Sequence, residues 1–212
     1  MNDIRLILVD PKTELCNAFR EQFQHFSNVE IVVGRFEQLS EFDCMVSAAN
    51  SFGLMDGGVD YAITQFFGDS LQSRVQQRII AEFLGEQPVG TSIIVETDNP
   101  KHPYIAHTPT MRVPMAISRT DNVYIAMWSM LLAVRQHNLK SNKKINIVAC
   151  SGLGTATGRV DFQRAAWQMA LAYENFLKPP SYIDWRYADQ RQERIKLGGD
   201  MGLTFPPDMK LS

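Results

Sequence analysis

Apolar runs alternate with amphipathic segments along most of the 212-residue chain. Short apolar runs are typical of buried strands, whereas apolar residues at every third or fourth position indicate helices. The predicted strands cover residues 5–9, 29–33, 44–48, 91–96, 104–106 and 145–150. The first predicted helix begins at Pro11 with Asp10 as its N-cap, and the others cover residues 59–67, 71–83, 123–134 and 162–176. This alternation predicts an α/β fold whose mixed or mostly parallel sheet is covered by helices on both faces.

The length and composition are typical of one globular domain. Hydrophobic residues make up 45% and charged residues 21% of the chain, which is enough to bury a sizeable core. The composition changes at Ser181, so we expect a domain over residues 1–180 and a C-terminal extension over 181–212, first helical and then a loose tail. No basic segment followed by a long apolar one opens the chain, and the apolar residues 124–134 are too few to span a bilayer. We therefore expect a cytoplasmic protein without a membrane segment.

Charge and cysteine content narrow the class of partner. The 21 basic and 23 acidic residues give a net charge of −2, which argues against a duplex nucleic-acid binder because such proteins present a basic face. Phosphate ligands stay open, since backbone amides bind phosphate without formal charge. Cys16, Cys44 and Cys150 are odd in number and far apart, so we expect no disulfide framework. The four histidines show no metal-ligand spacing, so we expect neither a metal nor a cofactor, and we expect His107 to be packed or hydrogen-bonded.

Two glycine-bearing segments each follow a predicted strand and precede a predicted helix. The first contains Gly57 and Gly58, and the second runs from Ser151 to Gly158. A loop in this position presents backbone N–H groups to a phosphate. Two such loops suggest a ligand with two phosphates, or with a phosphate and a sugar. Because ligands of open α/β sheets bind beyond the carboxyl ends of strands, we expect both loops to face one crevice.

The residues of these segments resemble a known family. Ser47-Ala48-Ala49-Asn50 followed by Gly57-Gly58-Val59-Asp60 resembles the hallmark of macro domains, and residues 151–158 resemble the second loop of that family. The second loop and the segment from Pro109 to Pro114 are most similar to a subgroup common in bacteria and their phages. The resemblance covers residues 4–177 and implies a three-layer α/β/α sandwich with a mixed central sheet.

Macro domains bind ADP-ribose, and the resemblance implies which residues of this chain would do so. Asn50 would bind a hydroxyl of the distal ribose, the first loop would pass close to the diphosphate, and the second loop would wrap it. The resemblance implies Asn50 and Asp60 as catalytic residues. It implies ligand contacts for Phe36, Asn50, Gly57, Gly58, Val59, Ser151, Gly152, Leu153, Gly154, Thr155, Ala156, Thr157 and Gly158.

Two of these residues have a second interpretation. In hydrolytic members of the family, the Asp that matches Asp60 helps to activate a water near the anomeric carbon, which a carboxylate can do as a general base. Asp60 also lies in the first turn of a predicted helix, where an acidic residue stabilises the helix dipole. Asn50 ends a strand, where asparagine is a common turn residue. The ligand role and the turn role both stay open for Asn50.

Two departures from the family pattern bear on function. Gly34-Arg35-Phe36 stands where the family has Gly-Asp-Ile or Gly-Asp-Leu, and arginine has no acceptor for the adenine amino group. Either adenine specificity is lost, or Glu37 or a backbone carbonyl supplies the acceptor. Tyr61 and Ala62 follow Asp60 where many hydrolytic members carry a histidine. The leading hypothesis is a hydrolase of ADP-ribosyl bonds or of ADP-ribose 1″-phosphate. A non-catalytic reader of ADP-ribose is the second hypothesis, and an accessory protein that lost its ligand is the third.

Overall fold

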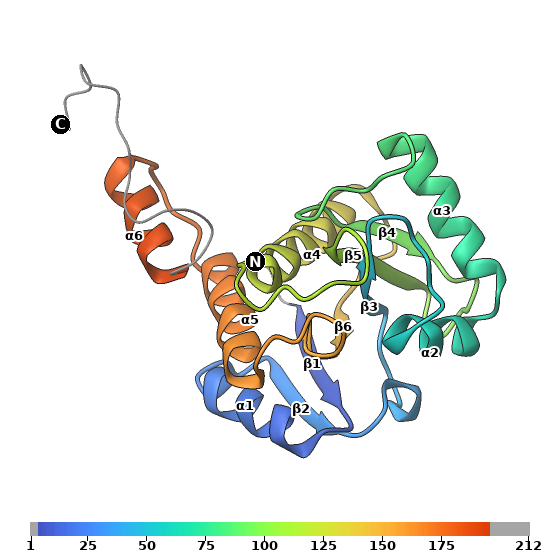
Figure 1. Ribbon diagram of the computed structural model, residues 1–212, viewed down its shortest axis with the longest axis horizontal. Helices are drawn as coiled ribbons and strands as arrows, with labels where there is room; N and C mark the ends of the chain where they lie inside the picture. The colour runs from blue at the N-terminus through green and yellow to red at the C-terminus, as the bar shows by residue number, and fades with distance from the viewer. Residues whose placement is uncertain (1–3, 196–212) are drawn as a thin grey trace.

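A six-stranded mixed sheet forms the centre of the computed structural model, which describes residues 4–195 (Figure 1). The strands follow the order β2-β1-β6-β3-β5-β4. They are β1 (Arg5–Asp10), β2 (Val29–Val33), β3 (Cys44–Asn50), β4 (Ile93–Glu96), β5 (Tyr104–Met111) and β6 (Ile147–Cys150). All neighbouring pairs described are parallel apart from β4 with β5. The parallel strands therefore direct their carboxyl ends to one edge of the sheet.

Helices cover both faces of this sheet. They are α1 (Thr13–Phe23), α2 (Gly58–Phe67), α3 (Ser70–Phe83), α4 (Asn122–Lys140), α5 (Phe162–Leu177) and α6 (Trp185–Ile195). On β1, Leu6 and Leu8 belong to the core beneath α1, α4 and α5, whereas Ile7 and Val9 belong to the core beneath α2 and α3. This alternation follows from the two-residue period of a strand. The structure confirms the expected three-layer sandwich with a mixed sheet.

Several element bounds differ from the sequence prediction, among them the end of α4 at Lys140 instead of residue 134, and two of the differences lie next to the carboxyl edge of the sheet. The first helix begins at Thr13 and not at Pro11, because Asp10 pairs with Val33 as the last residue of β1. The Asp10 carboxylate Oδ1 accepts a hydrogen bond from the Lys12 backbone N–H at 3.0 Å instead of capping the helix. Strand β5 extends to Met111, past the predicted end at residue 106 and through a proline. β4 pairs with β5 only as far as His107, and proline is tolerated where a strand lacks one neighbour.

Helix α6 lies beyond α5, on the opposite side of the molecule from α3 (Figure 1). The Arg191 guanidinium lies 4.8 Å from the centroid of the Trp128 ring and donates to the Tyr124 hydroxyl. These contacts connect α6 to α4, while Arg194 pairs with Glu174 of α5. The predicted helical start of the extension is thus present as α6, and the tail predicted from Gly198 lies outside the described residues. Among residues 4–195, no helix is both long and apolar enough to cross a membrane.

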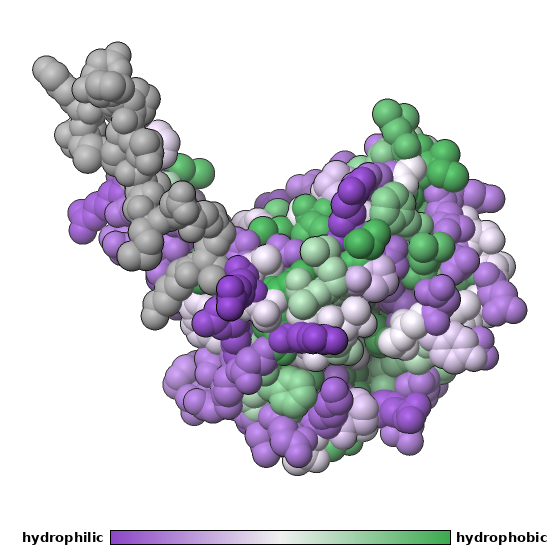
Figure 2. Space-filling view, viewed as in Figure 1, coloured by the Kyte–Doolittle hydropathy of each residue, from purple (hydrophilic) through white to green (hydrophobic). Residues whose placement is uncertain are grey.

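The surface of the molecule carries apolar side chains at the end of α3. Figure 2 shows this apolar area at the upper right, where Figure 1 places the last turn of α3. Ile80 is 63% exposed there, and Leu84 follows the helix in the left-handed conformation. Ile80 therefore contributes little to the core, in contrast to fully buried residues of the central strands.

We predict that Leu8→Ala lowers the free energy of unfolding by about 2–5 kcal/mol, because Leu8 is fully buried on a central strand. Ile80→Ala is the matched control, and we expect it to change the free energy by less than about 0.5 kcal/mol. Urea denaturation followed by circular dichroism measures both values. Equal losses in the two variants would contradict this description of the core.

Candidate functional site

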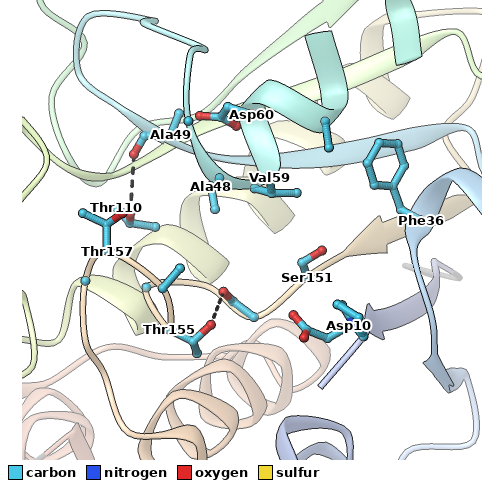
Figure 3. Close-up of a pocket in the computed structure, with 18 of the residues that line it drawn as sticks. Asp10, Phe36, Ala48, Ala49, Val59, Asp60, Thr110, Ser151, Thr155 and Thr157 are labelled. Atoms are coloured by element: carbon cyan, nitrogen blue, oxygen red, sulfur yellow. Dashed lines mark hydrogen bonds between the residues drawn. The ribbon is translucent and has the colours of Figure 1, made fainter. Parts of the chain in front are cut away.

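The carboxyl edge of the sheet contains a cavity of about 440 Å³. Its walls come from the segments that follow β1, β2, β3, β5 and β6, which are the five strands with parallel neighbours. Both glycine loops line it, so the structure brings together the two segments that the sequence singled out (Figure 3). A cavity of this volume is in the range of small-molecule sites.

Nearly all predicted ligand contacts lie around this cavity. The residues of the first loop, Asn50 and Asp60 line it, as do Phe36 and all but one residue of 151–158. Leu153 differs, because its side chain is fully buried in the core and the residue does not line the cavity. The buried, apolar Leu153 side chain packs in the core and so holds the loop onto it.

The glycines of the second loop are required by close packing. A Cβ atom on Gly152 would lie 2.4 Å from Leu15 Cδ2, and one on Gly158 would lie 2.4 Å from the carbonyl oxygen of Gly154. Gly154 has a φ of +69°, which disfavours other residues. The Thr155 hydroxyl donates to the Gly152 carbonyl at 3.0 Å within the loop. The loop is therefore a fixed, tightly wound turn against α1 and the sheet.

The two glycines of the first loop have free space around them, in contrast to those of the second loop. A Cβ atom on Gly57 or Gly58 would meet no atom within 4 Å. Gly58 needs its positive φ of +58°, but Gly57 has an extended conformation that any residue adopts. Packing and backbone strain therefore do not explain the glycine at position 57. Its missing side chain leaves open space at the cavity wall.

Asn50 takes the turn role in the structure. Its side-chain Oδ1 accepts from the backbone N–H groups of Phe52 at 3.0 Å and Leu54 at 3.3 Å, and its Nδ2 donates to the Leu54 carbonyl at 2.7 Å. An amide group carries two donor hydrogens. One hydrogen of Nδ2 therefore stays available to a ligand, because Asn50 also lines the cavity.

Asp60 is a buried carboxyl group at the cavity wall, with 5% of its surface exposed. Its Oδ1 accepts a hydrogen bond from the Ser47 hydroxyl of β3 at 2.7 Å. Burial raises the pKa of the Asp60 carboxyl to about 7, the charge of Asp56 adds to the rise, and the Ser47 hydrogen bond opposes it. The carboxyl group thus changes charge near neutral pH, which suits a general acid or base.

His107 lies beside this pair. It is in register with Ser47 on the neighbouring strand and is fully buried. Its Nδ1 contacts Gln87 Oε1 at 2.8 Å, and Gln87 Nε2 donates to the His107 carbonyl at 3.2 Å. Burial lowers the pKa of the His107 imidazole to about 3, so the ring is neutral. The expectation of a packed, hydrogen-bonded histidine is confirmed.

The other end of the cavity combines an aromatic ring with charged groups. Phe36 and Asp10 both line the cavity, on the side of Figure 3 opposite Thr110 and Thr157, with Asp10 next to Ser151. The Gly34 N–H donates to the Asp10 carbonyl at 3.1 Å, which keeps the ends of β1 and β2 adjacent. Arg35 is exposed and lines the cavity, as does Lys12.

Sequence reasoning missed three residues of this site. Asp10 is predicted to be the N-cap of the first helix, and Lys12 falls inside that predicted helix, although Asp10 directly follows a predicted strand and the carboxyl ends of strands are expected to form the crevice. Ser47 was recognised only as a small residue of a motif. The signal for Ser47 was its polarity at a strand position where its neighbours are apolar. In residues 4–195, no three side chains of the His, Cys, Asp and Glu types gather as a metal site would require.

Comparisons with known proteins agree with this geometry. A family model described as Macro domain matches residues 46–169. An uncharacterized protein of Aquifex aeolicus is 28% identical over 149 residues, which are 70% of this chain and 82% of that protein.

Solved structures of macrodomains share the fold. The Mycobacterium tuberculosis DarG macrodomain is 18% identical with a TM-score of 0.56, over 67% of this chain and 87% of its own. A mutant Oceanobacillus iheyensis macrodomain with ADPR is 22% identical with a TM-score of 0.57, over 77% of this chain and 89% of its own. The same macrodomain with ADP gives 22% identity and a TM-score of 0.57, over 77% and 87% of the two chains.

The family model covers more than half of the sequence, and the matched residues include Ser47, both glycine loops and Asp60. The fold, with its mixed sheet between two helical layers, is the one that the solved macrodomains have. This chain therefore belongs to the macro domain family.

Proposed function

We propose that this protein binds ADP-ribose or an ADP-ribosylated compound and hydrolyses an ADP-ribosyl bond or ADP-ribose 1″-phosphate. The observation that carries the proposal is the buried Asp60 carboxyl on the wall of a cavity that both glycine loops line. Membership of the macro domain family and the ADPR and ADP complexes of the Oceanobacillus iheyensis macrodomain support the choice of ligand. The domain we assign to this activity covers residues 1–180, followed by the extension 181–212.

Binding of the diphosphate rests on the two loops. Residues of the turn from Ser151 to Gly158 line the cavity, and this supports phosphate binding because the backbone N–H groups of such a turn bind phosphate oxygens without formal charge. The open space at Gly57 lets the ligand approach the first loop closely. The free Nδ2 hydrogen of Asn50 binds a hydroxyl of the distal ribose. Lys12 and Arg35 also line the cavity and add positive charge to it.

Hydrolysis uses Asp60 as a general base. Asp60 in its ionised form accepts a proton from a water, and that water attacks the anomeric carbon of the distal ribose. The bond between this carbon and the attached group breaks, and the leaving group departs with the electron pair and takes up a proton. The negative charge of Asp60 also stabilises the positive charge that develops on the ribose. The products are ADP-ribose and the released group.

Asp10 replaces the acceptor that Arg35 lacks. The family position for adenine recognition falls on Arg35, which is exposed and has only donors. Asp10 ends the neighbouring strand β1, which lies between β2 and β6, and its carboxylate is at the same end of the cavity as Phe36. The Asp10 carboxylate therefore accepts the hydrogen bond of the adenine amino group, while Phe36 lines the base site.

A non-catalytic reader is the second candidate function. Asn50 uses most of its amide for the turn at residues 52 and 54, and no histidine follows Asp60 in the first turns of α2. Both observations favour a site that binds ADP-ribose without turning it over. Variants of Asp60 and Gly57 separate the two functions, because a protein that only binds ADP-ribose needs the loops and not the charge of Asp60.

We predict that Asp60→Asn lowers kcat/KM for ADP-ribose release by about 10²–10⁴-fold at pH 7, because the amide cannot accept the proton. Wild-type activity is expected to rise with pH through about 7, since ionisation of Asp60 creates the base. Chromatographic assay of released ADP-ribose measures the rate, and calorimetric titration should give an unchanged affinity. Asp69→Asn, an exposed control, should keep full activity. Tight binding with no turnover of any tested substrate would establish the reader instead.

We predict that Gly57→Val weakens ADP-ribose binding by at least about tenfold and, because Gly57 is the N-cap of α2, lowers the melting temperature only slightly. The added side chain enters open space in the free protein but meets the ligand. Gly152→Ala is the contrasting variant, and its Cβ would collide with Leu15, so we expect a lower melting temperature. Calorimetric titration and thermal denaturation measure the two effects. Normal affinity in Gly57→Val would contradict the path assigned to the ligand.

We predict that the protein prefers ADP-ribose to inosine diphosphate ribose by about tenfold or more, because hypoxanthine has a carbonyl in place of the amino donor. Asp10→Ala should abolish this preference, whereas Arg35→Ala should keep it. Competition binding with the two nucleotides measures both ratios. A preference that survives in Asp10→Ala but disappears in Arg35→Ala would move base recognition away from Asp10.

A further inference from the structure

A single hydroxyl group contacts the carboxylate of Asp60 from the sheet. The Ser47 Oγ lies 2.7 Å from Asp60 Oδ1, and both side chains are buried, with Ser47 completely inaccessible to solvent. On the same face of β3, the preceding residue in this row is the fully buried Met45. A polar side chain at such a position costs stability unless it is hydrogen-bonded. The Ser47 hydroxyl proton is donated to Asp60.

The neighbouring side chain on the sheet cannot replace this donor. His107 pairs with Ser47 in register, and its Nδ1 faces Gln87 Oε1, which accepts because the other end of that amide donates to the His107 carbonyl. The Nδ1 atom therefore carries the proton, and Nε2 is an unprotonated acceptor. This Nε2 has no partner among the described residues. The sheet thus offers Asp60 one donor, which comes from Ser47.

The groups around Asp60 determine how strongly its ionised form depends on the Ser47 hydroxyl. Asp56, in the turn before α2, is a like charge and disfavours ionisation of Asp60. His107 on β5 is neutral and contributes no positive charge. On α2 itself, the Thr64 hydroxyl donates to the backbone carbonyl of Asp60 and not to its carboxylate. Among the side chains that face Asp60 from the turn, the helix and the sheet, Ser47 is therefore the one that favours the charged form.

We propose that Ser47 is a positioning residue, whose hydroxyl orients the Asp60 carboxylate toward the cavity and stabilises its ionised form. The inference rests on the proposed catalytic role of Asp60. With Oδ1 occupied by Ser47, the carboxylate rotation is fixed and Oδ2 faces the reacting water. The hydroxyl keeps enough of the carboxyl ionised at neutral pH for it to act as a base.

Titration of the free protein tests this proposal without any substrate. Carbon-13 NMR of labelled aspartate carboxyls gives the pKa of Asp60, and Asp60→Asn identifies its resonance. We expect Ser47→Ala to raise that pKa by roughly one unit, since it removes a hydrogen bond to the charged form. Ser129→Ala is the matched control, because Ser129 is a buried serine that donates to the Ala126 carbonyl on α4, and we expect no shift. An equal pKa in the two alanine variants would overturn the proposal.

A second variant covers the case in which Ser47→Ala does not fold. Ser47→Cys keeps the side-chain shape with a weaker donor, so we expect a pKa between those of wild type and the alanine variant. An unchanged pKa in Ser47→Cys would also overturn the proposal.

The pH profile supplies the functional readout. We expect the acid limb of kcat/KM in Ser47→Ala to move to higher pH by the same amount, which lowers the rate about tenfold at pH 6. A uniform loss of rate at every pH, with the limb in place, would show a structural role and overturn the proposal. If the protein binds ADP-ribose but never releases it from a substrate, the hydrolase proposal fails, while the carbon-13 titration still decides whether Ser47 controls Asp60.

Discussion

Parallel pairing of five strands is the constraint on which the site depends. Parallel strands send their carboxyl ends to one edge, so the segments after β1, β2, β3, β5 and β6 meet there although they are spread over residues 10–158. The helices between the strands cover both faces of the sheet and leave this edge open. The cavity is therefore a consequence of topology, and the loop sequences determine what it contains.

The two glycine loops at this edge differ in how tightly their glycines are packed. Gly152 and Gly158 are packed so closely that a Cβ would collide with Leu15 or with the backbone, and they keep the second loop in one shape. A Cβ on Gly57 would contact no atom within 4 Å, so the absence of a side chain there leaves open space at the cavity wall. A rigid turn opposite an open one is suited to a ligand whose phosphates are fixed on one side while its sugar passes close to the other.

The burial of Asp60 converts an ordinary helix-start residue into a group that changes charge near neutral pH. An acidic residue in the first turn of an exposed helix would be ionised throughout the physiological range. Here α2 packs its first turn against β3, so Asp60 faces Ser47 and loses most of its contact with water. Desolvation and the hydrogen bond act in opposite directions on the same carboxyl group. Their balance sets the pH range in which the Asp60 carboxyl is ionised.

The sequence by itself determined the fold class, most of the elements and the two loops, because apolar periodicity and glycine between strand and helix are local signals. It misplaced the start of α1 at Pro11 with Asp10 as its N-cap, since the pairing of Asp10 with Val33 involves residues far apart in the chain. Only the tertiary structure showed that β1 lies between β2 and β6, which brings Asp10 to the wall of the cavity. It also decided that Asn50 holds a turn and that Ser47 contacts Asp60. Such contacts depend on strand order and on how closely a helix packs, and neither quantity is encoded in a local pattern of residues.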